Sequence, residues 1–159
     1  MSPQTFFWTT FFAFLPISEL RGAIPFALSQ GMPWYVAMLY SVGINALVAP
    51  VCWIFLSTVH RLLYHWGWYR KTFDAFVERA RAKVHEKVEA WGWLGIAAFV
   101  AIPLPVTGAW TGTLGAWILG LDKKKTFLAV IIGVVLAGCI VTAVSLLGIS
   151  ALAIFMKKL

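Results

Sequence analysis

Two charged residues near the start of the sequence, Glu19 and Arg21, are of types that can handle protons and anions. They stand two positions apart in the stretch FLPISELRGAIPF, residues 14–26, whose other side chains carry no charge. A glutamate can exchange a proton. Burial raises the pKa of its carboxyl group, and a neighbouring arginine lowers it. A guanidinium matches the geometry of a phosphate. We therefore predict that Glu19 carries a proton and that Arg21 binds an anionic head group.

The same two residues also allow a purely structural interpretation. Ionisable residues at membrane depth are costly and usually have a function, but a glutamate and an arginine can also form an ion pair that fixes a turn. A spacing of two positions does not place side chains on one helical face. Such a pair therefore requires a break in the helix, and both interpretations place Glu19 and Arg21 at a turn.

The composition indicates a membrane protein. Of 159 residues, 61% are hydrophobic and 12% are charged, and the mean hydropathy is +0.84, whereas soluble domains are about a quarter charged. The length fits one membrane domain, residues 1–159. We assign the formal net charge of +7 to contact with anionic lipid rather than nucleic acid. Cys52 and Cys139 have no metal-ligand spacing, so we expect no metal and no cofactor.

Apolar runs of two lengths alternate along the chain. The first short run would be about 17 Å long as a helix and cannot cross a hydrocarbon core of about 30 Å. The short runs come in pairs, 5–15 with 22–30 and 91–102 with 108–121. The long runs can cross, and they are 33–58, where Pro50 predicts a kink, and 126–156.

Proline and glycine interrupt both pairs of short runs in a similar way. The first break reads P-x5-G-A and the second reads P-x4-G-A. Pro25 suits the first turn of one half-helix, and Thr107 could cap the N-terminus of the other. We expect the breaks to be formed by Pro16, Gly22, Pro25, Pro103, Pro105 and Gly108.

The order of elements predicts an all-α integral membrane protein built from two inverted repeats. Each repeat is a re-entrant helical hairpin followed by a long transmembrane helix, at residues 1–58 and 91–159, and a basic amphipathic helix at 59–90 joins them. One long helix separates the hairpins, so they enter from opposite faces and their turns meet near the midplane. Interrupted apolar segments at matching places in two halves indicate a transporter site, and free helix N-termini there favour anions.

Other polar residues near the breaks are candidates for binding substrate together with Arg21. They are Asn45 in the first long run and Thr107 and Thr111 beside the second break. Asn45 could instead only cross-link helices, and the threonine hydroxyls could bond back to the helix backbone. The sequence leaves these alternatives open.

The segment between the repeats is basic and amphipathic. Seven Lys and Arg lie within residues 61–87, while Phe73, Val77, Ala80 and Val84 recur on one helical face. Such a helix lies on a membrane surface or against transmembrane helices. We predict that residues 61–87 contact anionic lipid, and the positive-inside rule places this segment in the cytoplasm.

Both breaks carry a family resemblance. The segments PISELRGAIPFAL and IPLPVTGAWTGTLGAWILG resemble the two motifs of the small multidrug export proteins, over nearly the whole chain. The order of elements is also distantly similar to the DedA/VTT superfamily. That similarity implies re-entrant hairpins with charged turns, a prokaryotic cell membrane, and lipid transport or scrambling coupled to protons. The superfamily tends to carry charges in both hairpins, whereas residues 91–121 here carry none.

Three functions follow as hypotheses. The favoured one is a proton-coupled secondary transporter or flippase for an anionic lipid or amphiphile. The alternatives are a small cationic multidrug exporter, which Arg21 argues against by repelling cations, and a non-transporting membrane scaffold or assembly factor. Nucleotide-binding and hydrolase motifs are absent from the sequence, so we expect no enzyme. A homodimer would compensate for the little surface that so small a chain buries alone.

Overall fold

The computed structural model describes residues 2–75, 77–78, 91–104 and 107–156, and these residues form helices without any β-strand. The helices are α1 (Pro3–Phe14), α2 (Glu19–Ser29), α3 (Trp34–Ala46), α4 (Val48–Ser57), α5 (Val59–Leu63), α7 (Trp93–Ala101), α8 (Ala109–Ile118) and α9 (Lys123–Met156). Residues 67–75 are also helical. The all-helical fold expected from the sequence is therefore confirmed for the described residues.

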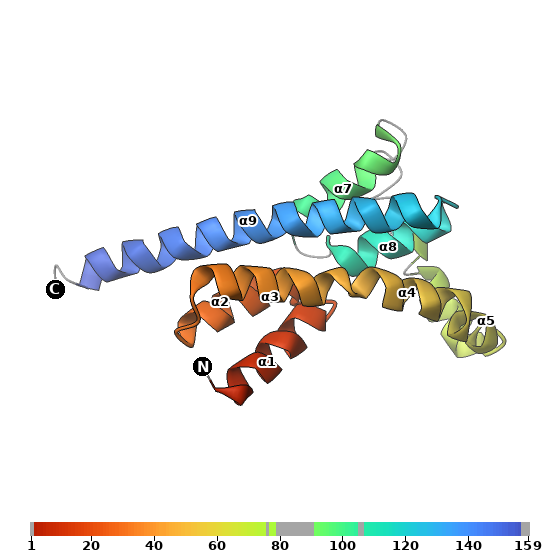
Figure 1. Cartoon of the computed structure of the whole chain (residues 1–159). Helices are drawn as coiled ribbons and strands as arrows, with labels where there is room; N and C mark the ends of the chain where they lie inside the picture. The colour runs from red at the N-terminus through yellow and green to blue at the C-terminus, as the bar shows by residue number, and fades with distance from the viewer. Residues whose placement is uncertain (1, 76, 79–90, 105–106, 157–159) are drawn as a thin grey trace.

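Two apolar helical segments form the long axis of the molecule and run side by side in opposite directions (Figure 1). One lies in α9 and the other is α3 followed by α4. The stretches Lys123–Ile149, with 27 residues, and Trp34–Ser57, with 24, are long and apolar enough to cross a membrane. At about 1.5 Å per residue, each is longer than a hydrocarbon core of about 30 Å.

The α3–α4 segment is interrupted at Leu47, between the two helices. Pro50 has no N–H, so the carbonyl of Ala46 lacks its usual helical donor. The N–H of Leu47 donates to the carbonyl of Ile44 at 3.2 Å, which tightens the turn at this point. The irregularity expected at Pro50 is therefore found one turn earlier, where the missing hydrogen bond falls.

The short helices form two hairpins, α1 with α2 and α7 with α8. Helix α2 leads into α3 and α8 leads into α9. Because α3 and α9 run in opposite directions, the open ends of the two hairpins face opposite ends of the molecule and their turns meet in its middle (Figure 1). The indole N–H of Trp110 in the second hairpin donates to the carbonyl of Phe14 in the first at 2.8 Å.

Glycines let α9 pack closely on its neighbours. A Cβ added to Gly133 would lie 2.7 Å from the carbonyl oxygen of Ala97 and 2.6 Å from the Cβ of Val100, in α7. A Cβ added to Gly138 would lie 2.5 Å from Val42, in α3. Small residues at membrane helix interfaces permit this close approach. The close packing of α9 on α7 and α3 fixes the helices that surround the hairpin turns.

Two local expectations are wrong. Helix α2 begins at Glu19, so Pro25 lies inside the helix rather than in its first turn. The N–H groups of Glu19 and Gly22 bond to the carbonyls of Leu15 and Ser18, so the turn runs directly into the helix. In the linker, a turn at 64–66 separates α5 from the helical residues 67–75, where one continuous helix was expected. Pro105 and residues 79–90 lie outside the described residues.

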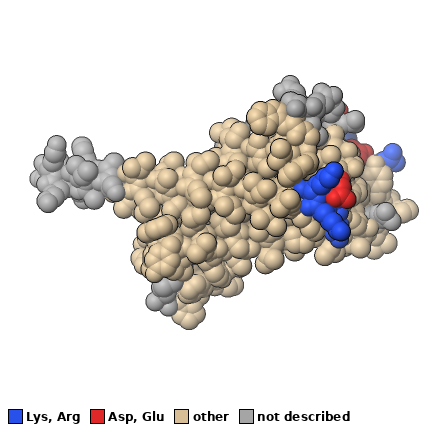
Figure 2. All heavy atoms as spheres, turned by 45° about the horizontal axis from the view of Figure 1, so that its top comes forward, with Lys and Arg blue, Asp and Glu red and all other residues tan. Residues whose placement is uncertain are grey.

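Charged side chains gather toward the end of the molecule at which α9 begins (Figure 2). Lys123, Lys124 and Lys125 are exposed there. Helix α5, at the start of the linker, lies at the same end (Figure 1). The basic start of α9 and the described part of the linker therefore share one end of the molecule.

Candidate functional site

The carboxylate of Glu19 lies against the N-terminus of α8, in the opposite hairpin. The backbone N–H of Ala109 donates to Oε2 at 3.2 Å, and that of Trp110 donates to Oε1 at 3.4 Å. First-turn amides have no partner within their own helix, and the helix dipole favours a negative charge beside them. The sequence led us to expect free helix N-termini at the site. At α8 this is wrong, because the protein's own carboxylate, 6% exposed, occupies that position.

Unusual backbone conformations bring these groups together. Glu19 has a φ of +48°, in a region that few non-glycine residues adopt. Gly108, immediately before α8, has a φ of +153°, which is open essentially to glycine. A Cβ added to Gly108 would collide with the Glu19 carboxylate. The glycine of the second break is therefore required for the close approach of the carboxylate as well as for the turn.

Arg21 also reaches across to the second hairpin. Its Nη1 donates to the backbone carbonyl of Leu104, in the break between α7 and α8. Its Nη2 is buried and has no hydrogen-bond partner. Glu19 and Arg21 both lie in the described part of the chain, and they make no ion pair with one another within 4 Å. The two side chains therefore form no contact ion pair in this structure, and each charge instead binds backbone of the opposite hairpin.

Asn45, at the end of α3, closes the site from the side of the long helix. Its Nδ2 donates to the carbonyl of Ala13 in α1 at 2.7 Å, and the residue is 0% exposed. Its Oδ1 is buried without a partner. Asn45 therefore does cross-link helices, as the sequence allowed, but only one half of its amide is engaged.

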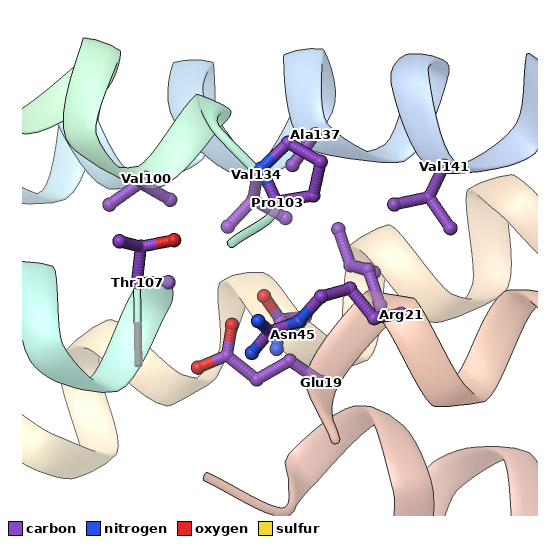
Figure 3. A pocket seen from close by; sticks show the side chains of 11 residues that line it. Glu19, Arg21, Asn45, Val100, Pro103, Thr107, Val134, Ala137 and Val141 are labelled. Carbon is purple, nitrogen blue, oxygen red and sulfur yellow. The ribbon is translucent and has the colours of Figure 1, made fainter. Parts of the chain in front are cut away.

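These groups line a small cavity (Figure 3). Its volume is about 10 Å³, which is about enough for one water molecule. Pockets for small organic ligands measure about 300 Å³ or more. Apolar side chains from α2, α7 and α9 form the rest of the wall, and its polar and break residues are Glu19, Arg21, Asn45, Pro103, Thr107 and Gly108. This cavity therefore has no room for a substrate.

The two threonines expected at the site have different places. Thr107 lines the cavity, but its hydroxyl lies 2.6 Å from the carbonyl of Ile102 and 2.8 Å from that of Leu104. It therefore braces the break and does not cap α8, which is a correction to the capping expected from the sequence. Thr111 is buried within α8 and is not among the residues that line the cavity.

Two residues of the first break have structural roles. Pro16 lies in the turn between α1 and α2 and is exposed. A Cβ added to Gly22 would clash with the side-chain oxygen of Ser18, so glycine lets the start of α2 pack on the turn. Among the described residues, no group of three or more His, Cys, Asp or Glu could hold a metal ion.

Trp110 is a residue of the site that sequence reasoning missed. Its backbone N–H binds Glu19, and its indole N–H binds the carbonyl of Phe14. The indole ring also packs edge-on against Phe14, with centroids 5.4 Å apart. Trp110 therefore joins both hairpin turns, yet nothing in the sequence distinguishes it from the other eight of the nine tryptophans.

His60, outside the hairpins, connects the linker to the second hairpin. Its ring lies 4.1 Å from that of Phe73 and 5.6 Å from that of Trp117 in α8, measured between centroids. Burial lowers the pKa of His60, and the nearby charge of Asp74 partly opposes this. The cluster anchors the start of the linker and lies apart from the cavity.

Comparison with known proteins bears on the whole site. A family model described as "Putative small multi-drug export protein" matches residues 19–140. The matched range begins at Glu19 and includes every residue that lines the cavity except Val141. Neither the curated proteins nor the solved structures yield a match. The family resemblance expected from the sequence is confirmed, while the similarity to the DedA/VTT superfamily stays a prediction.

Proposed function

Because the chain belongs to the family of small multidrug export proteins, we propose that it is a secondary transporter that moves an anionic lipid or amphiphile across a membrane, coupled to protons. The family and the two long apolar helices together identify a membrane protein. The choice of an anionic substrate and of proton coupling comes from the chemistry of Glu19 and Arg21.

The proposal includes the membrane arrangement of the two hairpins. Helix α1 has 12 residues and α8 has 10, so each extends about 15–18 Å and cannot cross the hydrocarbon core. We infer that α1–α2 and α7–α8 are re-entrant and belong to inverted repeats, residues 1–58 and 91–159. Their opposed directions and central turns in Figure 1 support this inference. Backbone breaks at membrane depth are tolerated where protein buries them or where they line a water-filled cavity. At these breaks Glu19 and Gly108 are buried, whereas Pro16, Ile17 and Leu104 are exposed.

One observation carries the functional proposal. The two charges of the first turn bind the backbone of the second turn and, with it, line a cavity too small for a substrate. A substrate can enter only if these contacts separate. The buried, unpartnered Nη2 of Arg21 is then a donor for an anionic group, and a guanidinium binds phosphate oxygens well. We take this arrangement, in which the two turns are in contact, as the closed step of an alternating-access cycle.

The second candidate is export of organic cations, which the family description favours. The unpartnered Oδ1 of Asn45 is a suitable acceptor for a cationic donor. Arg21 would repel a cation from the same cavity, so we rank this function second.

Reconstitution into proteoliposomes separates the two candidates. We expect flux of a fluorescent anionic phospholipid that depends on a pH gradient and is lost in Glu19→Gln, because glutamine keeps the shape but cannot titrate. Asp74→Asn is the matched control, since Asp74 is exposed and makes an ion pair outside the cavity, and its flux should equal that of the parent. Flux of a cationic dye with none of the anionic lipid would overturn the proposal in favour of the multidrug exporter.

We also propose that the basic end of the molecule faces the cytoplasm and contacts anionic lipid through residues 61–87 and Lys123–Lys125. The shared position of α5 and the start of α9 supports a single basic face (Figure 1). Single cysteines at Ser2 and Lys124 can be probed with a reagent that does not cross the membrane. We expect the cysteine at Ser2 to be labelled in intact cells, and the one at Lys124 only after the cells are opened. If both positions are labelled from the same side of the membrane, the re-entrant arrangement is contradicted. A homodimer stays a prediction.

A further inference from the structure

We propose that Asn45 is a second hydrogen-bonding position for Glu19, which leaves the N-terminus of α8 when it is protonated and then donates to the Oδ1 of Asn45. This inference rests on the proposed proton-coupled function and deepens it. It states where the proton carrier moves and which groups its movement frees.

The amide of Asn45 is held in one orientation. Its Nδ2 donates to the carbonyl of Ala13 at 2.7 Å, so Oδ1 cannot exchange places with the nitrogen without losing that bond. Asn45 is 0% exposed, and its Oδ1 has no partner. A buried acceptor left without a donor is unfavourable. We infer that another step of the transport cycle supplies the missing donor.

The polar groups around the cavity limit the choice of donor. Among the described residues, the polar side chains that line it are Glu19, Arg21, Asn45 and Thr107. The Thr107 hydroxyl lies against the carbonyls of its own break. Figure 3 shows the side chains of Glu19, Arg21 and Asn45 converging on the same space. Glu19 and Arg21 therefore remain as partners for Asn45.

A single proton changes Glu19 from one type of partner into the other. As a carboxylate it can only accept hydrogen bonds, which suits the amides of Ala109 and Trp110 and excludes a bond to Oδ1 of Asn45. Once protonated, it loses the charge that the α8 dipole favours and gains one O–H donor. The proton that weakens the first position thus creates the donor that the second position lacks.

This movement couples the proton to the substrate. When Glu19 moves to Asn45, the N–H groups of Ala109 and Trp110 become available, beside the free Nη2 of Arg21. Together these donors match an anionic group with several oxygens, such as a phosphate. A deprotonated Glu19 and a bound anion exclude each other, so the proton and the anion are bound in the same state.

Asn45 is the single asparagine in the sequence, which gives the proposal a selective probe. Asparagine with an isotope label in its side-chain carbonyl, incorporated into the full chain in lipid, produces one labelled infrared band. We expect this band to move to lower wavenumber as the pH falls, with the same midpoint as the carboxyl band that disappears in Glu19→Gln. In Glu19→Gln itself the labelled band should stay at the low-pH position at every pH, because the glutamine amide donates permanently.

Two further variants complete the test. Asn45→Leu removes the acceptor that stabilises protonated Glu19, so the midpoint of the Glu19 carboxyl band should fall by about one pH unit. Ser41→Ala is the matched control, because Ser41 is 0% exposed on the same face of α3 but does not line the cavity. Its titration should equal that of the parent.

A labelled Asn45 band that is independent of pH in the parent would overturn the proposal. It would indicate that Oδ1 accepts a hydrogen bond from Arg21 or from a water molecule instead. This measurement needs no substrate and no flux, so its failure is distinct from that of the proposed function. Gradient-driven flux with a pH-independent Asn45 band would refute the hydrogen bond from Glu19 to Asn45 but support the proposed transport function. An Asn45 band that shifts with pH, without flux of any lipid, would support the movement of Glu19 but refute the proposed transport function.

Discussion

The two hairpin turns meet in the middle of the molecule but contribute opposite kinds of group. The first turn supplies charged side chains, Glu19 and Arg21. The second supplies backbone, namely the N–H groups of Ala109 and Trp110 and the carbonyl of Leu104. An uncharged hairpin is therefore no sign of a missing site, because peptide groups freed by a break can bind charges from elsewhere.

This difference explains how the two turns bind each other although only one of them carries charged side chains. The sequence resemblance implied charged residues in both turns, and residues 91–121 have none. A glycine backbone takes their place, since Gly108 lets the carboxylate reach amides that any larger residue would cover. The comparison predicts that the second turn is sensitive to backbone changes and the first to charge changes.

The largest effect on stability is expected at Gly108. Gly108→Ala forces an unfavourable φ and places a Cβ against the Glu19 carboxylate, so it should destabilise the protein by about 2–4 kcal/mol. Gly43→Ala is the control, because a Cβ there meets no atom within 4 Å and alanine favours a helix by about 1 kcal/mol. Melting in detergent measures both. Equal melting temperatures for the two variants would contradict the role assigned to the backbone of the second turn.

A smaller effect is expected for Arg21→Gln. It weakens a charged hydrogen bond to the carbonyl of Leu104 and should cost about 2 kcal/mol. Arg70→Gln is the matched loss of an arginine, from an ion pair with Asp74 at 3.8 Å whose side chains are 63% and 52% exposed, and it should cost less than about 1 kcal/mol. Denaturant titration of both variants makes the comparison. If Arg70→Gln proves the more damaging, Arg21 does not hold the hairpins together.

The smallest effect is expected for Trp110→Phe. Phenylalanine keeps an aromatic ring against Phe14 but loses the indole N–H that binds its carbonyl, at a cost of about 1 kcal/mol. Trp34→Phe, at an exposed tryptophan, should be close to neutral. Thermal melting should rank the two in this order, and a neutral Trp110→Phe would show that the turns adhere without this bond.

Sequence reasoning finds groups that are costly in their surroundings, and it misses their partners. Glu19 and Arg21 stand out because a charge in an apolar stretch has few structural uses. Their partners are peptide groups 83 to 91 residues away, and every residue has such groups, so no side-chain pattern marks them. Pro25 and Thr107 were misplaced for a related reason, since hydrogen bonds within each break decide where the helix begins. Trp110 carries no local signal, and its role depends on tertiary contact alone.

The contact between Glu19 and the N-terminus of α8 is the central claim, and the backbone amide of Trp110 reports on it most directly. Nuclear magnetic resonance of protein labelled with tryptophan nitrogen gives one backbone signal for each of the nine tryptophans, and the signal lost in Trp110→Phe assigns Trp110. We predict that this signal shifts with pH in the parent, as the carboxylate that it binds becomes protonated, and that the shift disappears in Glu19→Gln. A Trp110 signal that is constant across pH in the parent, or that titrates equally in Glu19→Gln, would contradict the account.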